Sequence, residues 1–102
     1  MKRLEHIEHC KGQGQLFRER TLRFVVLYDI DVYQELTESL PDMAPVSGLR
    51  EIRGFLTGLS EAELWSLQHQ PLTLILSDGR ELELELGAKG EVIPHGEFHS
   101  PH

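Results

Sequence analysis

The clearest hydrophobic pattern in the chain lies in residues 71–86, where leucine occupies every second position of two consecutive runs. A period of two places alternate side chains on one face of a β-strand, so each run predicts a strand with its leucines in a core. Asp78-Gly79 between the runs predicts a hairpin turn. The leucines of the predicted hairpin are Leu72, Leu74, Leu76, Leu82, Leu84 and Leu86.

The length of the hairpin loop decides which side chains share a face. A two-residue loop would place Leu74 opposite Glu83 and mix leucines with glutamates. A three-residue loop over 77–79 instead pairs Leu74 with Leu82 and keeps the leucine face pure. We therefore predict a bulged turn with a positive φ at its glycine and an outer row formed by Glu81, Glu83 and Glu85.

Alternation predicts three earlier strands. The first covers about residues 7–17, where Gly12 and Gly14 permit a bend or the close approach of another backbone. A polar turn follows at 18–20. The second strand, 21–34, would span about 45 Å, so it must bend or pair with two partners. Its apolar face comprises Leu22, Phe24, Val26, Tyr28, Ile30 and Val32.

The second half of the chain adds a loop, a third strand and a helix. Proline, glycine and polar residues predict a loop over 36–50, followed by a strand over 51–58. Ser60 and Glu63 form a capping box, which predicts a short helix at about 60–69 with Trp65 packing at its edge. Residues 91–93 indicate a short edge strand, and residues 95–102 indicate a loose tail.

This order of elements predicts a mainly β fold, a small antiparallel barrel or sandwich formed by residues 1–94 as one domain. Three strands, a helix and two further strands resemble the OB fold in element order, so an OB-like barrel is one possible arrangement. A fold of this kind does not by itself determine a function.

Charge is distributed unevenly over the 102 residues. Residues 1–24 contain six basic and three acidic groups, whereas residues 25–102 contain four basic and fourteen acidic groups, for a net charge of −7. The acidic body argues against broad binding to nucleic acid or anionic membranes. With a single cysteine, no signal-like apolar segment and no apolar run of membrane-spanning length, the expected location is the cytoplasm.

Histidines suggest one alternative, a metal-binding protein, because imidazole and thiolate are ligands for zinc, nickel and copper. The competing interpretation is a set of solvated polar side chains. Asp29 and Asp31 share a strand face about 7 Å apart, with no histidine near them in the sequence. The candidate metal ligands are His6, His9 and Cys10 near the start, and His95, His99 and His102 near the end.

Basic residues around the first turn suggest a second alternative, binding of single-stranded nucleic acid. In an OB-like barrel this turn borders the groove where aromatic rings stack on bases and arginines contact phosphates. The same residues are equally typical of an ordinary solvated hairpin tip. They are Lys11, Phe17, Arg18, Arg20 and Arg23.

Three apolar side chains on the otherwise polar face of the second strand give the leading hypothesis. Val25, Leu27 and Tyr33 must be covered by another part of the chain or by a partner. We found no catalytic set, since His9 and Cys10 would point to opposite faces of a strand. We therefore expect a non-enzymatic protein-interaction or self-associating module without a cofactor.

Overall fold

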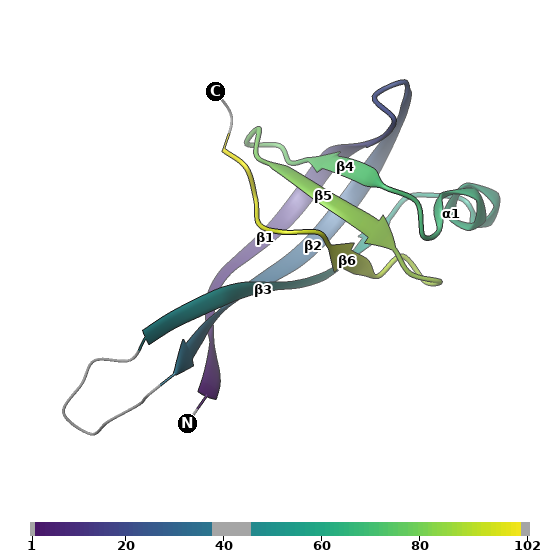
Figure 1. Cartoon of the computed structure of the whole chain (residues 1–102). Helices are drawn as coiled ribbons and strands as arrows, with labels where there is room; N and C mark the ends of the chain where they lie inside the picture. Colours follow the sequence, from purple (N-terminus) through teal and green to yellow (C-terminus); the bar gives the residue numbers. More distant parts are fainter. Residues whose placement is uncertain (1, 38–45, 101–102) are drawn as a thin grey trace.

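The computed structural model describes residues 2–37 and 46–100. They form six antiparallel strands and one helix, which confirms the predicted mainly β class. The sheet has the order β3-β2-β1-β4-β5-β6 (Figure 1). The elements are β1 (Lys2–Arg18), β2 (Leu22–Thr37), β3 (Val46–Thr57), α1 (Glu61–Leu67), β4 (Leu72–Ile75), β5 (Glu81–Leu86) and β6 (Val92–Pro94).

The two ends of the sheet meet, so that the six strands make a nearly closed barrel. The amide of Leu56 on β3 donates to the carbonyl of Gly90, just before β6, at 2.9 Å, and Phe55 bridges to Glu91. Gly90 has a φ of +86°, and a Cβ there would lie 2.6 Å from the Leu56 carbonyl oxygen. Closure therefore requires glycine at this position.

Strands β1, β2 and β3 are long and continue together past the barrel (Figure 1). β2 pairs with β1 on one side and with β3 on the other, as its length predicted. The pairing shifts register between His6 and Glu8 and between Gln34 and Leu36. β1 starts earlier than expected, because its first residues find partners on the far end of β2.

The predicted loop over 36–50 is wrong at both ends. Leu36 and Thr37 belong to β2, and residues 46–50 belong to β3, because pairing between the two strands continues to Thr37 and Val46. Residues 38–45 of that predicted loop lie outside the described part of the chain.

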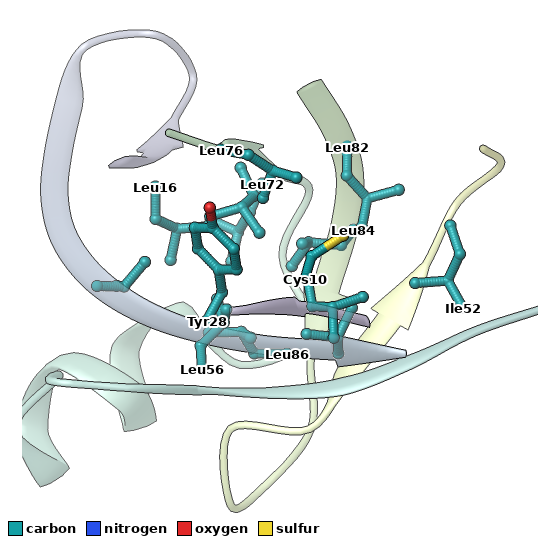
Figure 2. Close-up of a cluster of buried hydrophobic side chains, with 14 of the residues drawn as sticks. Cys10, Leu16, Tyr28, Ile52, Leu56, Leu72, Leu76, Leu82, Leu84 and Leu86 are labelled. Atoms are coloured by element: carbon teal, nitrogen blue, oxygen red, sulfur yellow. The ribbon is translucent and has the colours of Figure 1, made fainter. Parts of the chain in front are cut away.

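The core combines the leucine hairpin with the inner face of β2 (Figure 2). Leu74 pairs with Leu82 and Leu72 with Leu84, and Gly79 has a φ of +92°, which confirms the predicted bulged turn. Leu22 was expected on the buried face but is 44% exposed, because β2 begins beyond the barrel at the tip of the first hairpin.

Tyr28 explains the two glycines of β1. Its ring lies across Gly12 and Gly14, where a Cβ would come within 3.0 Å of the Tyr28 hydroxyl and 2.6 Å of the Ile75 carbonyl oxygen, respectively. The hydroxyl accepts a hydrogen bond from the backbone amide of Ser77 at 3.2 Å and lies 2.8 Å from the Ser77 hydroxyl. The absent side chains thus let β2 contact the β4–β5 turn across β1.

The helix forms where the capping box predicted. Ser60 Oγ accepts from the Glu63 amide at 3.1 Å, and Glu63 Oε1 accepts from the Ser60 amide at 2.8 Å. Leu67 is fully buried and anchors the helix to the barrel. Trp65 is 77% exposed, so its predicted packing at the helix edge is wrong; it lies two positions from Leu67, on the opposite side of a helix.

The segment after β6 also differs from the expected loose tail. The amide of His95 donates to the Glu83 carbonyl at 2.8 Å, and His99 and Glu81 exchange two backbone hydrogen bonds of 2.8 and 3.0 Å. Phe98 packs against the core. Beyond β6, the edge of β5 has backbone amides and carbonyls that need partners, and residues 95–100 supply them by following that edge. His102 lies outside the described residues.

Candidate functional site on the outer face of β1, β2 and β3

Three large apolar side chains are exposed together on the outer face, the side of β1, β2 and β3 turned away from the core. Val25 and Leu27 on β2 and Phe55 on β3 are 54%, 53% and 54% exposed. Leu27 and Phe55 line one shallow hollow with Lys11. We call Val25, Leu27 and Phe55 the apolar patch.

The apolar patch agrees only in part with the predicted interaction residues. Val25 and Leu27 are as exposed as expected, but Tyr33 lies six residues further along β2, about 20 Å from Leu27 at strand spacing. Its ring contacts that of His6 at 5.2 Å and the Arg53 guanidinium at 5.2 Å. Tyr33 is therefore already half covered by its own chain.

Phe55 was missed as a candidate because its neighbour comes from another strand. Alternation in the third strand places Phe55 on the other face of that strand from Ile52 and Leu56, but no sequence pattern specifies which residue of the neighbouring strand lies beside it. In the structure Phe55 pairs with Asp29, next to Leu27. Leu27 is thus a diagonal cross-strand neighbour of Phe55, about 7–8 Å away and within reach of an aromatic ring, so Phe55 extends the patch sideways.

Charged groups of opposite sign border the apolar patch along β2. Arg23 precedes Val25 by two residues, and Asp29 and Asp31 follow Leu27 on the same face. Across the sheet, Lys11 pairs with Asp29 and Arg53 with Asp31. The outer face thus has a positive end at Arg23 and an apolar middle. The other end, where Asp29 and Asp31 lie beside Lys11 and Arg53, we call the acidic end after its two aspartates.

Two histidines of β1 meet the two aspartates at the acidic end. His9 Nε2 lies 2.6 Å from Asp29 Oδ1, and His6 Nε2 lies 2.9 Å from Asp31 Oδ1. One donor atom each from His9, Asp29 and Asp31 all lie within 4.8 Å of one another. The sequence could not bring these groups together, because the pairs join residues 20 and 25 positions apart.

The other predicted metal ligands lie elsewhere. Cys10 faces the core, where burial raises the pKa of its thiol. His95 pairs with Glu85 beside the barrel, at 2.5 Å, and His99 follows the edge of β5. Among the members of the predicted set that the structure describes, only His6 and His9 share a site, and Cys10 is separated from them by the sheet itself.

Arg80 forms the most connected polar group of the described chain. Its guanidinium donates to both carboxylate oxygens of Glu8 at 3.0 Å and to Asp78 at 2.9 Å, and it lies 4.9 Å from the Phe98 ring. The hydrogen bonds from Arg80 lower the pKa of Glu8, and the Arg80 amide lowers that of Asp78. We call this group, including Cys10, the Arg80 network.

The predicted nucleic-acid residues separate into two places. Phe17, Arg18, Arg20 and Arg23 gather at the tip of the β1–β2 hairpin, where Phe17 pairs with Arg23. Lys11 lies seven residues away, opposite Asp29. Glu81 borders the same hollow as Phe17 and Arg20, which places a carboxylate beside the basic tip.

Comparisons with models of known protein families, with curated proteins and with solved structures returned no match. No helix among the residues that the structure describes is long and apolar enough to cross a bilayer. The arrangement of side chains on the outer face is therefore the basis for a functional proposal.

Proposed function

We propose that this protein is a non-enzymatic, self-associating module in which two copies stack through their outer faces. The observation that supports the proposal is the apolar patch, three large side chains that are each more than half exposed and border one another. Contiguous apolar surface on a small domain is typical of an interface.

The charges at the two ends of the patch favour a second copy of the chain as the occupant. When two copies stack with antiparallel β2 strands, a two-fold axis through the patch places Arg23 of each copy near Asp29 of the other. A parallel arrangement would place Asp29 over Asp29 and Arg23 over Arg23. Opposite charges attract and like charges repel, so the face is complementary to itself in the antiparallel arrangement only.

The size of the patch predicts a weak dimer. Burying one large apolar side chain is worth about 1.5–3 kcal/mol, so covering the exposed half contributes about 1 kcal/mol, or about 6 kcal/mol for six side chains. Two exposed ion pairs add about 1 kcal/mol in total. An association cost of about 4 kcal/mol leaves about 3 kcal/mol, which corresponds to a dissociation constant of about 6 mM.

Sedimentation over a range of protein concentrations tests the proposal. The wild-type chain should show a concentration-dependent dimer, weaker in high salt because the Arg23–Asp29 pairs are screened. Leu27→Lys should abolish the dimer. Leu49→Lys is the matched control, since Leu49 is also a strand leucine, is 79% exposed and lies outside the patch.

A charge reversal tests the antiparallel arrangement itself. Arg23→Glu should weaken association by placing like charges together, and Arg23→Glu combined with Asp29→Arg should restore it. With a dissociation constant of about 6 mM, about a fifth of the chains should be in dimers at about 1 mM, so a wild-type chain whose average mass does not rise up to that concentration would refute self-association. A dimer that still forms in Leu27→Lys, and whose affinity is unchanged by Arg23→Glu alone or combined with Asp29→Arg, would show that the interface lies elsewhere.

The gathering of Phe17 with three arginines supports a second candidate, binding of single-stranded nucleic acid at the tip of the first hairpin. Arginines contact phosphates and an aromatic ring stacks on a base. This candidate predicts salt-sensitive binding to oligonucleotides that is weakened by Arg18→Ala with Arg20→Ala. The net charge of −7 opposes binding to a polyanion. Absence of oligonucleotide binding at low salt would therefore eliminate this candidate.

A further inference from the structure

The geometry points to a binding site for a divalent transition-metal ion at the acidic end of the outer face, formed by His6, His9, Asp29 and Asp31. All four ligands belong to one chain, so the site needs no second copy; Asp29 is also the residue that the proposed dimer places near Arg23 of the other copy. We call these four residues the His/Asp group.

Three members of the His/Asp group, His9, Asp29 and Asp31, already bring their ligand atoms together, and His6 lies beside one of them, Asp31. The ligand atoms of these three lie within 4.8 Å of one another, and His6 Nε2 is 2.9 Å from Asp31 Oδ1. Four ligands at about 2.0–2.2 Å from a tetrahedral zinc ion are about 3.3–3.5 Å apart. Small movements of the exposed side chains of His9, Asp29 and Asp31 would therefore form three sides of a coordination shell, and His6 would turn from Asp31 to supply the fourth ligand.

The sheet fixes the positions from which these side chains reach. Asp29 and Asp31 lie two residues apart on β2, so both project from one face, and His9 pairs directly with Asp31. His6 reaches the same face because the register shift between His6 and Glu8 changes the parity of β1 at that point. The bulge thus adds a second imidazole that simple alternation would turn away.

The chemistry of the donors selects the class of ion. Two neutral imidazoles and two carboxylates carry a total charge of −2, which balances a divalent cation. Nitrogen and oxygen donors in equal number suit zinc, cobalt or nickel, whereas calcium and magnesium prefer oxygen alone. All four side chains are between 40% and 52% exposed, so an ion can enter directly from solvent.

Calorimetric titration of the full chain with zinc chloride tests the site, with cobalt as a spectroscopic probe. The wild-type chain should take up one zinc ion per chain, and bound cobalt should show the absorption of a tetrahedral nitrogen and oxygen site. His9→Ala and Asp29→Asn should each lower the zinc affinity by about tenfold or more, because each removes a ligand. Calcium should not compete.

His95→Ala is the matched control. His95 is half exposed and pairs with Glu85 much as His9 pairs with Asp29, yet among the described residues only His9, Asp29 and Asp31 form a group close enough to hold an ion. His95→Ala should leave zinc uptake unchanged. Circular dichroism of each variant distinguishes loss of a ligand from loss of the fold.

The remaining outcomes decide against the site. Absence of saturable zinc uptake by the wild-type chain would show that the two pairs serve only as ion pairs between strands. Uptake that persists in His9→Ala combined with Asp29→Asn would assign it to other histidines. Uptake that is lost in Leu27→Thr, an uncharged substitution in the apolar patch, would mean that the ligands come from two copies.

Discussion

Arg80 joins three parts of the chain that are distant in sequence, and its replacement by methionine should destabilise the fold. The guanidinium connects Glu8 on β1, Asp78 in the β4–β5 turn and the ring of Phe98 after β6. Methionine retains an apolar stem of similar length but removes every hydrogen bond of the guanidinium, while the bond from the backbone amide to Asp78 remains. Arg80→Met therefore isolates the polar part of the Arg80 network.

The expected loss follows from the exposure of the partners. The Arg80 side chain is 24% exposed and that of Glu8 is 40% exposed. Their bidentate ion pair is therefore partly buried, and it contributes about 1.5 kcal/mol to the free energy of unfolding. The more exposed Asp78 contributes about 0.5 kcal/mol. The contact with Phe98 adds about 0.5–1 kcal/mol. The sum, about 2.5–3 kcal/mol, lowers Tm by about 10–20 °C in a domain of this size.

Urea unfolding measures this loss, and its pH dependence identifies the cause. The Arg80 guanidinium lowers the pKa of Glu8 in the folded state, whereas the pKa of Asp78 is lowered chiefly by the Arg80 backbone amide, which methionine keeps. The stabilising effect of the guanidinium is therefore complete above the unfolded value for Glu8, about 4.3. The effect disappears as the pH falls through the lower folded value. The difference between wild type and Arg80→Met should therefore be constant near pH 7 and shrink below about pH 4.

Arg53→Met is the control for Arg80→Met. Arg53 also contacts one carboxylate, that of Glu51 at 2.7 Å, and one aromatic ring, that of Tyr33, but its side chain is 59% exposed. Its loss should cost less than about 1 kcal/mol. The reasoning is refuted if Arg80→Met costs no more than Arg53→Met, or if its cost is unchanged at pH 2.

Two substitutions and one chemical modification test how side chains pack inside the barrel. Gly14→Ala should destabilise by about 2–3 kcal/mol in urea unfolding, because the new Cβ would lie 2.6 Å from the Ile75 carbonyl oxygen. Tyr28→Phe should cost about 1 kcal/mol, since the hydroxyl is hydrogen-bonded to Ser77, and no cost would mean that water replaces it. Cys10 should react with iodoacetamide much more slowly in the folded chain than in urea, because burial raises the pKa of its thiol; equal rates would contradict its burial.

Local patterns predicted those elements whose partners are close in the sequence. The leucine hairpin follows from alternation on both sides of Asp78-Gly79, since only one loop length keeps the leucines on one face. The capping box at Ser60 uses residues three positions apart. In both cases the interacting residues are close in the sequence, so their spacing alone determines how they meet. The sequence was therefore sufficient to predict these two elements.

Contacts between distant segments could not be predicted in the same way. The approach of His6 to Asp31 depends on pairing between β1 and β2 and on a bulge that no local pattern marks. Phe55 joins Leu27 only through the register of β3. The backbone pairing of His99 with Glu81 depends on a free edge of β5, which exists only once the barrel has formed.

Strand β2 divides folding and proposed function between its two faces. Even-numbered residues 26–32 are buried in the core, whereas Arg23, Val25, Leu27, Asp29 and Asp31 lie on the outer face. Apolar side chains on that face add nothing to the core, so replacing them should spare the fold. Val25→Thr combined with Leu27→Thr retains one β-branched residue and introduces another, so strand propensity is kept.

This double substitution should change the free energy of unfolding of the monomer by less than about 1 kcal/mol, because both side chains are more than half exposed. The same protein should lose its dimer in sedimentation experiments, since four of the six side chains that would meet in the interface are shortened or made polar. A large loss of stability in dilute solution would instead mean that the patch is covered within its own chain. The two measurements together therefore decide whether the outer face of β2 serves the fold or an interface between copies.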